Sequence, residues 1–171
     1  LEVIEDAIGN VIMRKPATPG MEDRKSIILQ SHLDMVHQKN NDTDFDFLTQ
    51  GIQMIVEGDI IKANGTTLGA DNGIGVASIM AVLSSNDIAH PAIEALFTID
   101  EETGMTGAME LDKNILKSTI LLNLDTEEDD EIDIGCAGGV DVTATKSYLL
   151  ESLSDDYISK KITVKGLNGG H

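Results

Sequence analysis

Three short apolar runs, each followed within two residues by histidine or acidic residues, constrain the fold of this sequence more than any other feature. The runs cover residues 26–30, 92–99 and 119–124, and each has the length and composition of a buried strand. Residues 74–84 lie between the first two runs and carry apolar residues at helical spacing. Buried strands that alternate with helices predict an α/β fold: a mixed sheet with flanking helices.

Turn residues between short apolar segments predict antiparallel pairs at the margins of this sheet. Two hairpins are expected, residues 1–5 with 10–14 and residues 53–56 with 60–63. The other expected features are an exposed loop at residues 37–46 and a short helix that starts within residues 106–111.

The pattern changes near Gly138, where small residues give way to alternating polar and apolar ones. We therefore expect one domain over residues 1–138 and the beginning of a smaller α+β domain over residues 139–171, with a strand at 161–166. The chain opens on Leu1 rather than Met and stops at His171 within a strand-and-loop pattern, so truncation at both ends is expected.

The net charge of the chain argues against some classes of binding partner. Thirty acidic residues against 12 basic ones give a formal charge of −18. Such a surface repels phosphate backbones and anionic lipid, which argues against nucleic acid and membranes as partners. The sequence has neither an apolar run long enough to span a bilayer nor a signal peptide. Cys136 is the single cysteine, which excludes an intrachain disulfide and fits a reducing, cytoplasmic location.

Polar residues at the ends of the three apolar runs are the strongest functional signal. His32 and Asp34 follow the first run, Glu101 and Glu102 the second, and Asp125 the third. Ligands bind at the carboxyl ends of strands in open α/β sheets, so these side chains should converge. Asp71 joins them from a glycine-rich loop before the predicted helix, where N–H groups favour an anion.

Imidazole and carboxylates are the ligands of catalytic zinc, and two neighbouring ions can share one carboxylate. A carboxylate that is not a ligand can act as the base, and another can orient a ligating histidine. His32-x-Asp34 suits the last role, because residues i and i+2 of a strand share a face. Taken singly, Asp71 could cap the helix and Glu101 with Glu102 could be a solvated pair.

Five segments together resemble the co-catalytic zinc peptidases, a family of carnosinase-like enzymes, tripeptidases, aminoacylases and carboxypeptidases. They are Ser31–Asp34, Gly69–Gly73, Asp100–Gly104, Asn123–Asp125 and Gly169–His171. Within the family, residues 29–37 and 69–77 look most like aminoacyl-histidine dipeptidases. The resemblance covers essentially the whole chain. It implies a zinc aminopeptidase-like catalytic domain over residues 1–138 and a lid or dimerisation domain from residue 139.

The resemblance also implies roles for individual residues. His32 and Asp125 would hold one zinc ion, Glu102 would help hold the second, and Asp71 would bridge the two. Glu101 would be the general base and Asp34 would orient His32. His171 would bind a substrate carbonyl, either in its own subunit's site or in that of a partner subunit in a homodimer. The remaining histidines, His37 and His90, match no ligand position and are expected on the surface or in loops.

The same resemblance implies two-zinc hydrolysis of dipeptides, Xaa-His among them, with Co²⁺ or Mn²⁺ able to replace Zn²⁺. The family pattern has a fifth ligand, a histidine near the C-terminus, that this sequence lacks, so the fragment alone is expected to be inactive. An N-acyl amino acid amidohydrolase or carboxypeptidase on the same scaffold is an alternative. A non-catalytic acidic metal-binding module is another, although a calcium loop from Asp125 lacks the required glycine, with Asp130 at its sixth position.

Overall fold

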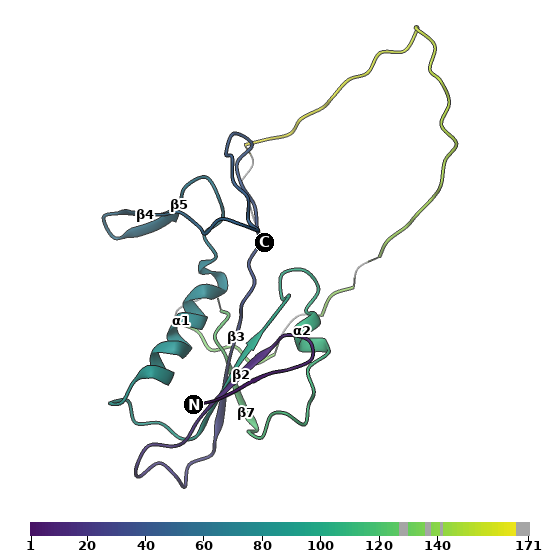
Figure 1. The fold of residues 1–171 in the computed structure, drawn as a ribbon. Helices are drawn as coiled ribbons and strands as arrows, with labels where there is room; N and C mark the ends of the chain where they lie inside the picture. Colours follow the sequence, from purple (N-terminus) through teal and green to yellow (C-terminus); the bar gives the residue numbers. More distant parts are fainter. Residues whose placement is uncertain (127–129, 136–137, 141, 167–171) are drawn as a thin grey trace. The chain divides into compact units, whose positions relative to one another are not determined.

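A computed structural model describes residues 1–126, 130–135, 138–140 and 142–166, and the chain divides into two units, Leu1–Glu131 and Ile132–His171. In the second unit, the described part has no helix or strand and follows an extended course with a turn at Ser154–Tyr157 (Figure 1). The strand predicted at residues 161–166 is therefore wrong, because no described segment pairs with it. The domain boundary at residue 138 stays a prediction.

A five-stranded mixed sheet forms the centre of the first unit, which confirms the predicted α/β class. Its strands are β1 (Glu2–Glu5), β2 (Val11–Lys15), β6 (Ile93–Thr98), β3 (Ile27–His32) and β7 (Ile120–Asn123), in that spatial order. The β1–β2 and β2–β6 pairs are antiparallel, whereas β3 is parallel to both β6 and β7. The three predicted apolar strands thus lie side by side and run in one direction.

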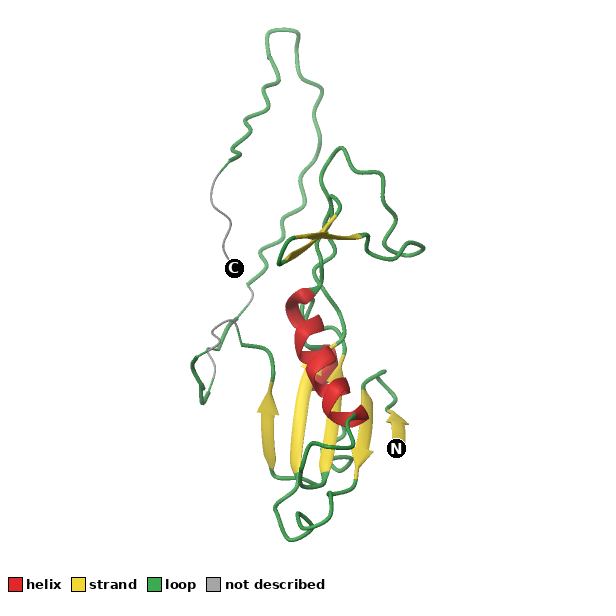
Figure 2. Ribbon diagram, turned by 90° about the vertical axis from the view of Figure 1, so that its left-hand side faces the viewer, coloured by secondary structure: helices red, strands yellow, loops and turns green. Residues whose placement is uncertain are grey.

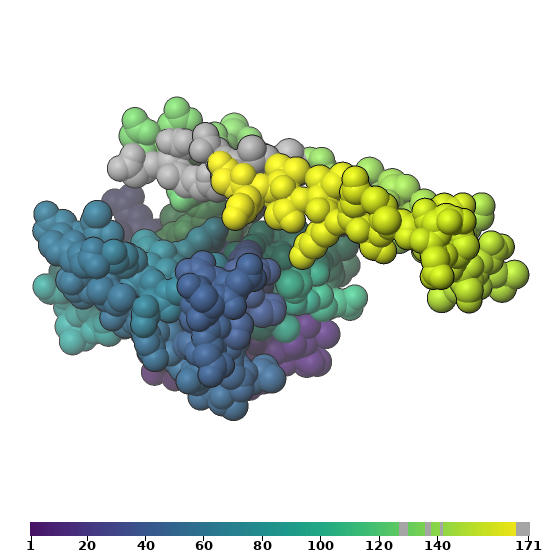
Figure 3. Space-filling model, turned by 90° about the horizontal axis from the view of Figure 1, so that it is seen from above, coloured from purple at the N-terminus to yellow at the C-terminus, as the bar shows by residue number. Residues whose placement is uncertain are grey.

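A second, two-stranded sheet stands apart from the first. It is the predicted hairpin of β4 (Met54–Glu57) and β5 (Ile60–Ala63). Figure 1 shows this hairpin beyond the end of the main sheet, and Figure 3 shows the blue and teal atoms of this part of the chain from above. Its apolar side chains are mostly exposed, so the hairpin adds little to the core.

One long helix, α1 (Ala70–Ser84), covers a face of the main sheet (Figure 2). It begins four residues earlier than predicted, after Gly69, whose φ of 79° suits glycine. Asp71 and Asn72 have non-helical backbone angles and are joined by a cis peptide bond, so the regular helix follows them. The short helix α2 is Thr106–Met109. No helix in the described part of the chain is both long and apolar enough to cross a membrane.

Alternate residues of the central strands point to opposite faces, as the strand period requires. On one face, Ile93, Ala95 and Phe97 of β6 pack against Ile79 and Leu83 of α1. On the other face, a smaller cluster joins three residues from neighbouring strands, Ile12, Ile28 and Leu96. All of β6 is buried, so this strand anchors both clusters.

One predicted burial state is wrong. The third apolar run was expected to be buried, but Ile120, Leu121 and Leu122 of β7 are 38–50% exposed. The strand lies at the sheet edge and pairs with β3 alone among the described strands. His90 lies in a loop, as expected, but it is only 4% exposed. Its backbone N–H donates to Thr18 Oγ1 at 2.9 Å, and this hydrogen bond links the loop of His90 to the loop of Thr18.

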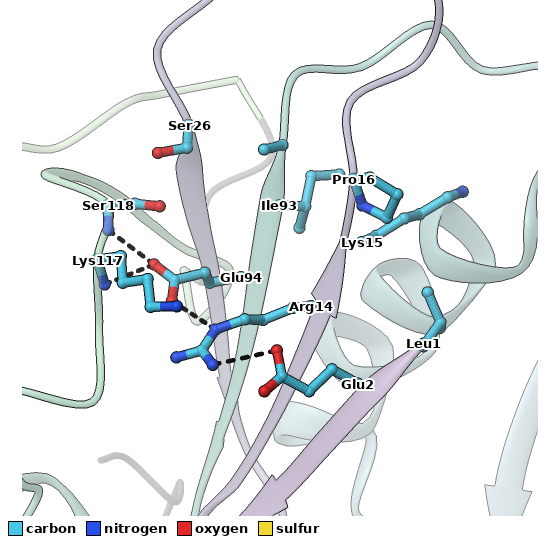
Figure 4. A pocket seen from close by; sticks show the side chains of 11 residues that line it. Leu1, Glu2, Arg14, Lys15, Pro16, Ser26, Ile93, Glu94, Lys117 and Ser118 are labelled. Atoms are coloured by element: carbon cyan, nitrogen blue, oxygen red, sulfur yellow. Dashed lines mark hydrogen bonds and ion pairs between the residues drawn. The ribbon is translucent and has the colours of Figure 1, made fainter. Parts of the chain in front are cut away.

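An ion pair between Arg14 and the buried Glu94 links β2 to β6 at the end of the sheet opposite the predicted site. Glu94 of β6 accepts hydrogen bonds from Arg14 Nε at 3.1 Å and from the backbone N–H groups of Lys117 and Ser118 at 2.9 and 2.7 Å (Figure 4). These residues line a pocket of about 470 Å³. Burial opposes ionisation of Glu94, but the hydrogen bonds from Ser118, Lys117 and Arg14 outweigh it and lower the pKa of Glu94.

We expect Glu94→Gln to destabilise the chain at pH 7 by about 1–3 kcal/mol, because Arg14 and the backbone N–H groups of Lys117 and Ser118 lose a charged acceptor. A lowered folded-state pKa contributes stability above the ordinary value of 4.5 and loses it as the pH falls through the folded value. The deficit of the variant should therefore shrink below about pH 4.5. Urea unfolding between pH 3 and 7 measures this, and a deficit independent of pH would contradict the ionised pairing.

Candidate metal centre

The parallel register of three strands brings the predicted site residues to one edge of the sheet. His32 at the end of β3 lies opposite Thr98 at the end of β6. Glu101 and Glu102 follow β6 in a tight turn, and Asp125 comes two residues after β7. Of the residues with predicted site roles, six lie together here: His32, Asp34, Asp71, Glu101, Glu102 and Asp125.

His32 lies at the centre of this group and is 1% exposed. Its Nδ1 lies 2.9 Å from the backbone oxygen of Asp34, an atom that can only accept, so Nδ1 carries the proton. Its Nε2 faces carboxylate oxygens of Asp71 at 3.2 Å, Asp125 at 3.7 Å and Glu101 at 3.9 Å. In the neutral ring, the lone pair of Nε2 therefore points into a cluster of anions.

Asp34 contacts both His32 and the turn that carries the two glutamates. Its Oδ1 lies 3.4 Å from His32 Nδ1, farther than its own backbone oxygen, so the main chain takes the closer contact with the ring. Its Oδ1 and Oδ2 accept the backbone N–H groups of Glu101 and Glu102, both at 3.0 Å. Asp34 thus connects the strand that carries the histidine to the turn that carries the glutamates, a contact that sequence spacing does not predict.

Asp100 shapes the same turn from its other side. Its φ is 62°, in the left-handed region, and its carboxylate accepts the hydroxyls of Thr103 and Thr106. Gly107 closes the turn: its N–H donates to the backbone oxygen of Ile99. A β-carbon at Gly107 would collide with that same backbone, so only glycine fits there.

Asn72 is a site residue that the sequence patterns did not single out. It follows Asp71, is 5% exposed, and donates through Nδ2 to Asp125 Oδ1 at 2.6 Å and to the backbone oxygen of Leu124 at 2.8 Å. An asparagine after an acidic residue at a helix start is a weak signal, because such residues commonly serve as caps.

Several carboxylates surround one imidazole in this cluster, and burial and their mutual charges shift the pKa values of its members. Burial opposes protonation of His32, but the charges of Asp125 and Asp34 and the hydrogen bond to Asp71 outweigh it and raise its pKa. Burial raises the pKa of Glu101, which Asp125 and Glu102 raise further while His32 opposes the shift. Burial likewise raises the pKa of Asp125. The pKa of Asp34 is lowered, since the N–H groups of Glu102 and Glu101 outweigh its burial.

The donor atoms fit a metal ion. Two groups, His32 with Asp71 and Glu102 and His32 with Glu101 and Asp125, each place their ligand atoms within 4.8 Å of one another. One imidazole nitrogen with carboxylate oxygens is a donor set that zinc accepts. A pocket of about 220 Å³ opens beside Glu101 and Asp125. His37 is exposed, as expected, and His171 lies outside the described residues.

This chain belongs to peptidase family M28, whose model matches residues 10–164. It is 52% identical over 169 residues to the cytosol non-specific dipeptidase of Escherichia coli, a match that covers 99% of this chain and 35% of that protein. The chain thus spans about a third of the length of this curated relative.

Solved structures agree with this assignment. The aminoacylhistidine dipeptidase of Vibrio alginolyticus matches 75% of this chain and 26% of its own, with 57% identity and a TM-score of 0.73. The aminopeptidase PepT of Bacillus cereus matches 74% of this chain and 34% of its own, with 31% identity and a TM-score of 0.59. The main sheet therefore has the fold of these peptidases.

Removal of the Asp34 carboxylate should weaken metal binding. We expect Asp34→Ala to raise the Kd for Zn²⁺ about 10–100-fold, because both His32 and the glutamate turn lose a support. Competition with a chromophoric chelator measures the Kd. Asp6→Ala is the matched control, since Asp6 also accepts backbone N–H groups in a turn but lies outside the cluster. Equal effects of the two variants would show that Asp34 acts only through general stability.

Proposed function

We propose that this chain supplies most of the active site of a two-zinc metallo-dipeptidase that cleaves short peptides with a free N-terminus, Xaa-His among them. The observation that carries the proposal is the position of His32 Nε2, buried and directed at Asp71, Asp125 and Glu101. The names of the relatives supply the substrate class: a cytosol non-specific dipeptidase and an aminoacylhistidine dipeptidase.

The ligands divide between two ions. His32 and Asp125 would hold the first ion, Glu102 would help to hold the second, and Asp71 would serve both. Asp71 suits a shared role because its Oδ1 lies 3.2 Å from His32 Nε2 while 63% of its side chain is exposed. Bound zinc ions polarise the peptide carbonyl and lower the pKa of water. Co²⁺ or Mn²⁺ can take the same ligands.

Glu101 performs the proton transfers. It reaches the cluster from the turn after β6, and the raised pKa of its carboxylate, caused first by burial, favours acceptance of a proton from the attacking water. The same carboxyl then delivers that proton to the leaving amine, so that the base is regenerated. Asp34 contributes by fixing the main chain of Glu101 and one side of the His32 ring.

The remaining features of the proposed enzyme lie beyond the main sheet. Residues 139–171 begin a lid domain through which two copies form a homodimer, and His171 binds the substrate carbonyl oxygen. A cytosolic location accords with the name of the Escherichia coli relative. An N-acyl amino acid amidohydrolase would use the same ligands, and it would differ in accepting substrates without a free α-amino group.

Activity is best tested in a chimera in which this chain replaces the corresponding segment of the Escherichia coli relative. Glu101→Gln in this chimera should lower kcat for a Xaa-His dipeptide about 10²–10⁴-fold with two zinc ions retained, because only the base is lost. His32→Ala should lose metal and activity together. Glu110→Gln, in an exposed glutamate nearby, is the control. A near-normal kcat in Glu101→Gln would show that Glu101 is not the general base.

The chain by itself should bind one zinc ion tightly and hydrolyse little. His32, Asp71 and Asp125 complete the first site, whereas the second has only Glu102 and the shared Asp71. Metal analysis after dialysis, together with hydrolysis of a Xaa-His dipeptide and its N-acetyl derivative, compares the chain with the chimera. Normal turnover by the chain alone would contradict the ligand assignment, and preference for the N-acetyl derivative would favour the amidohydrolase.

A further inference from the structure

We propose that Asn72 is a positioning residue for the metal centre: with Ser31 behind it, its side-chain amide fixes the orientation of the Asp125 carboxylate. This inference rests on the proposed function, because Asp125 matters there as a zinc ligand. It concerns two residues, Asn72 and Ser31, to which neither the ligand set nor the proton transfers assign a role.

The two carboxylate oxygens of Asp125 have different neighbours, Asn72 and His32. Asn72 Nδ2 donates to Asp125 Oδ1 at 2.6 Å, while Asp125 Oδ2 lies 3.7 Å from His32 Nε2. A carboxylate held through one oxygen cannot rotate freely about its Cβ–Cγ bond. The other oxygen therefore keeps its direction toward the ion site, which reduces the entropy lost when an ion binds.

Asn72 is itself held against the end of β7. Its second Nδ2 hydrogen goes to the backbone oxygen of Leu124 at 2.8 Å, one residue before Asp125. The same amide thus fixes both the main chain and the side chain at this point. Asn72 follows Asp71 directly at the start of α1. This short segment therefore carries the Asp71 carboxylate and also orients the Asp125 carboxylate, which follows β7.

Two buried oxygen atoms extend this arrangement to β3. Asn72 Oδ1 and Ser31 Oγ are both buried and have no hydrogen-bond partner among the described residues. A β-carbon at Gly75 would collide with each of them and with the backbone oxygen of Leu124, so the two oxygens border the same small space. In the proposed arrangement a small shift of the Ser31 side chain would let its hydroxyl donate to Asn72 Oδ1, since a hydroxyl donates and an amide oxygen accepts.

The proposed contacts would run from Ser31 through Asn72 to Asp125. Ser31 precedes His32 in β3 and is fully buried, so the strand that supplies the imidazole would also help to hold the carboxylate that faces it. Gly75 is required for this approach, because any side chain there would push α1 away from β3 and β7.

The test uses the chimera loaded with Co²⁺, whose visible absorption bands report ligand geometry. Asn72→Leu keeps the number and branching of the side-chain heavy atoms but removes the amide, and it should raise the Kd of the tightest ion about 10–100-fold and change the Co²⁺ spectrum. Ser31→Ala should act in the same direction with a smaller effect. If Asn72→Leu does not fold, Asn72→Asp, which puts an acceptor in place of the donor, carries the same expectation.

Ile79→Val is the control for lost stability, because Ile79 is fully buried in the same helix and packs only in the apolar core. It should lower Tm while the Kd and the Co²⁺ spectrum stay unchanged. A folded Asn72 variant with the parent Kd and spectrum would overturn the positioning role. A parent chimera that binds no metal would instead overturn the proposed function, and this inference with it.

Discussion

The parallel pairing of β3 with both β6 and β7 is the constraint on which the rest of the structure depends. Parallel strands end at the same edge of a sheet, so His32, the Glu101–Glu102 turn and Asp125 meet there without any long loop to guide them. The buried β6 fixes this alignment, since its alternate residues anchor the apolar clusters on both faces. Packing of the core therefore determines where the candidate site residues lie.

Local patterns in the sequence are enough to predict the strands that end in the site and the residues that lie there. Apolar runs and the residues after them depend on short-range order, which a single sequence displays directly. The exposure of β7 and the burial of His90 depend instead on which segments pair or pack across long distances. The contacts of Asp34 with the glutamate turn and of Asn72 with Asp125 are missed for the same reason.

Charge balance explains why these contacts are needed. One imidazole stands against the carboxylates of Asp34, Asp71, Asp125, Glu101 and Glu102, and burial raises the pKa of Glu101 and of Asp125. Backbone N–H groups neutralise part of the charge on Asp34, and an amide does so for Asp125. The remaining oxygens face His32 Nε2, where divalent cations would relieve the repulsion. The same forces that make the cluster costly without a cation make it a strong ligand set with one.

The central claim is that the strand ends of this sheet hold zinc between His32 and its surrounding carboxylates. X-ray diffraction from zinc-loaded crystals, recorded on either side of the zinc absorption edge, tests it most directly. We expect an anomalous peak about 2.0–2.2 Å from His32 Nε2 and from oxygens of Asp71 and Asp125. Strong zinc peaks elsewhere on the molecule, with none at these three residues, would contradict it.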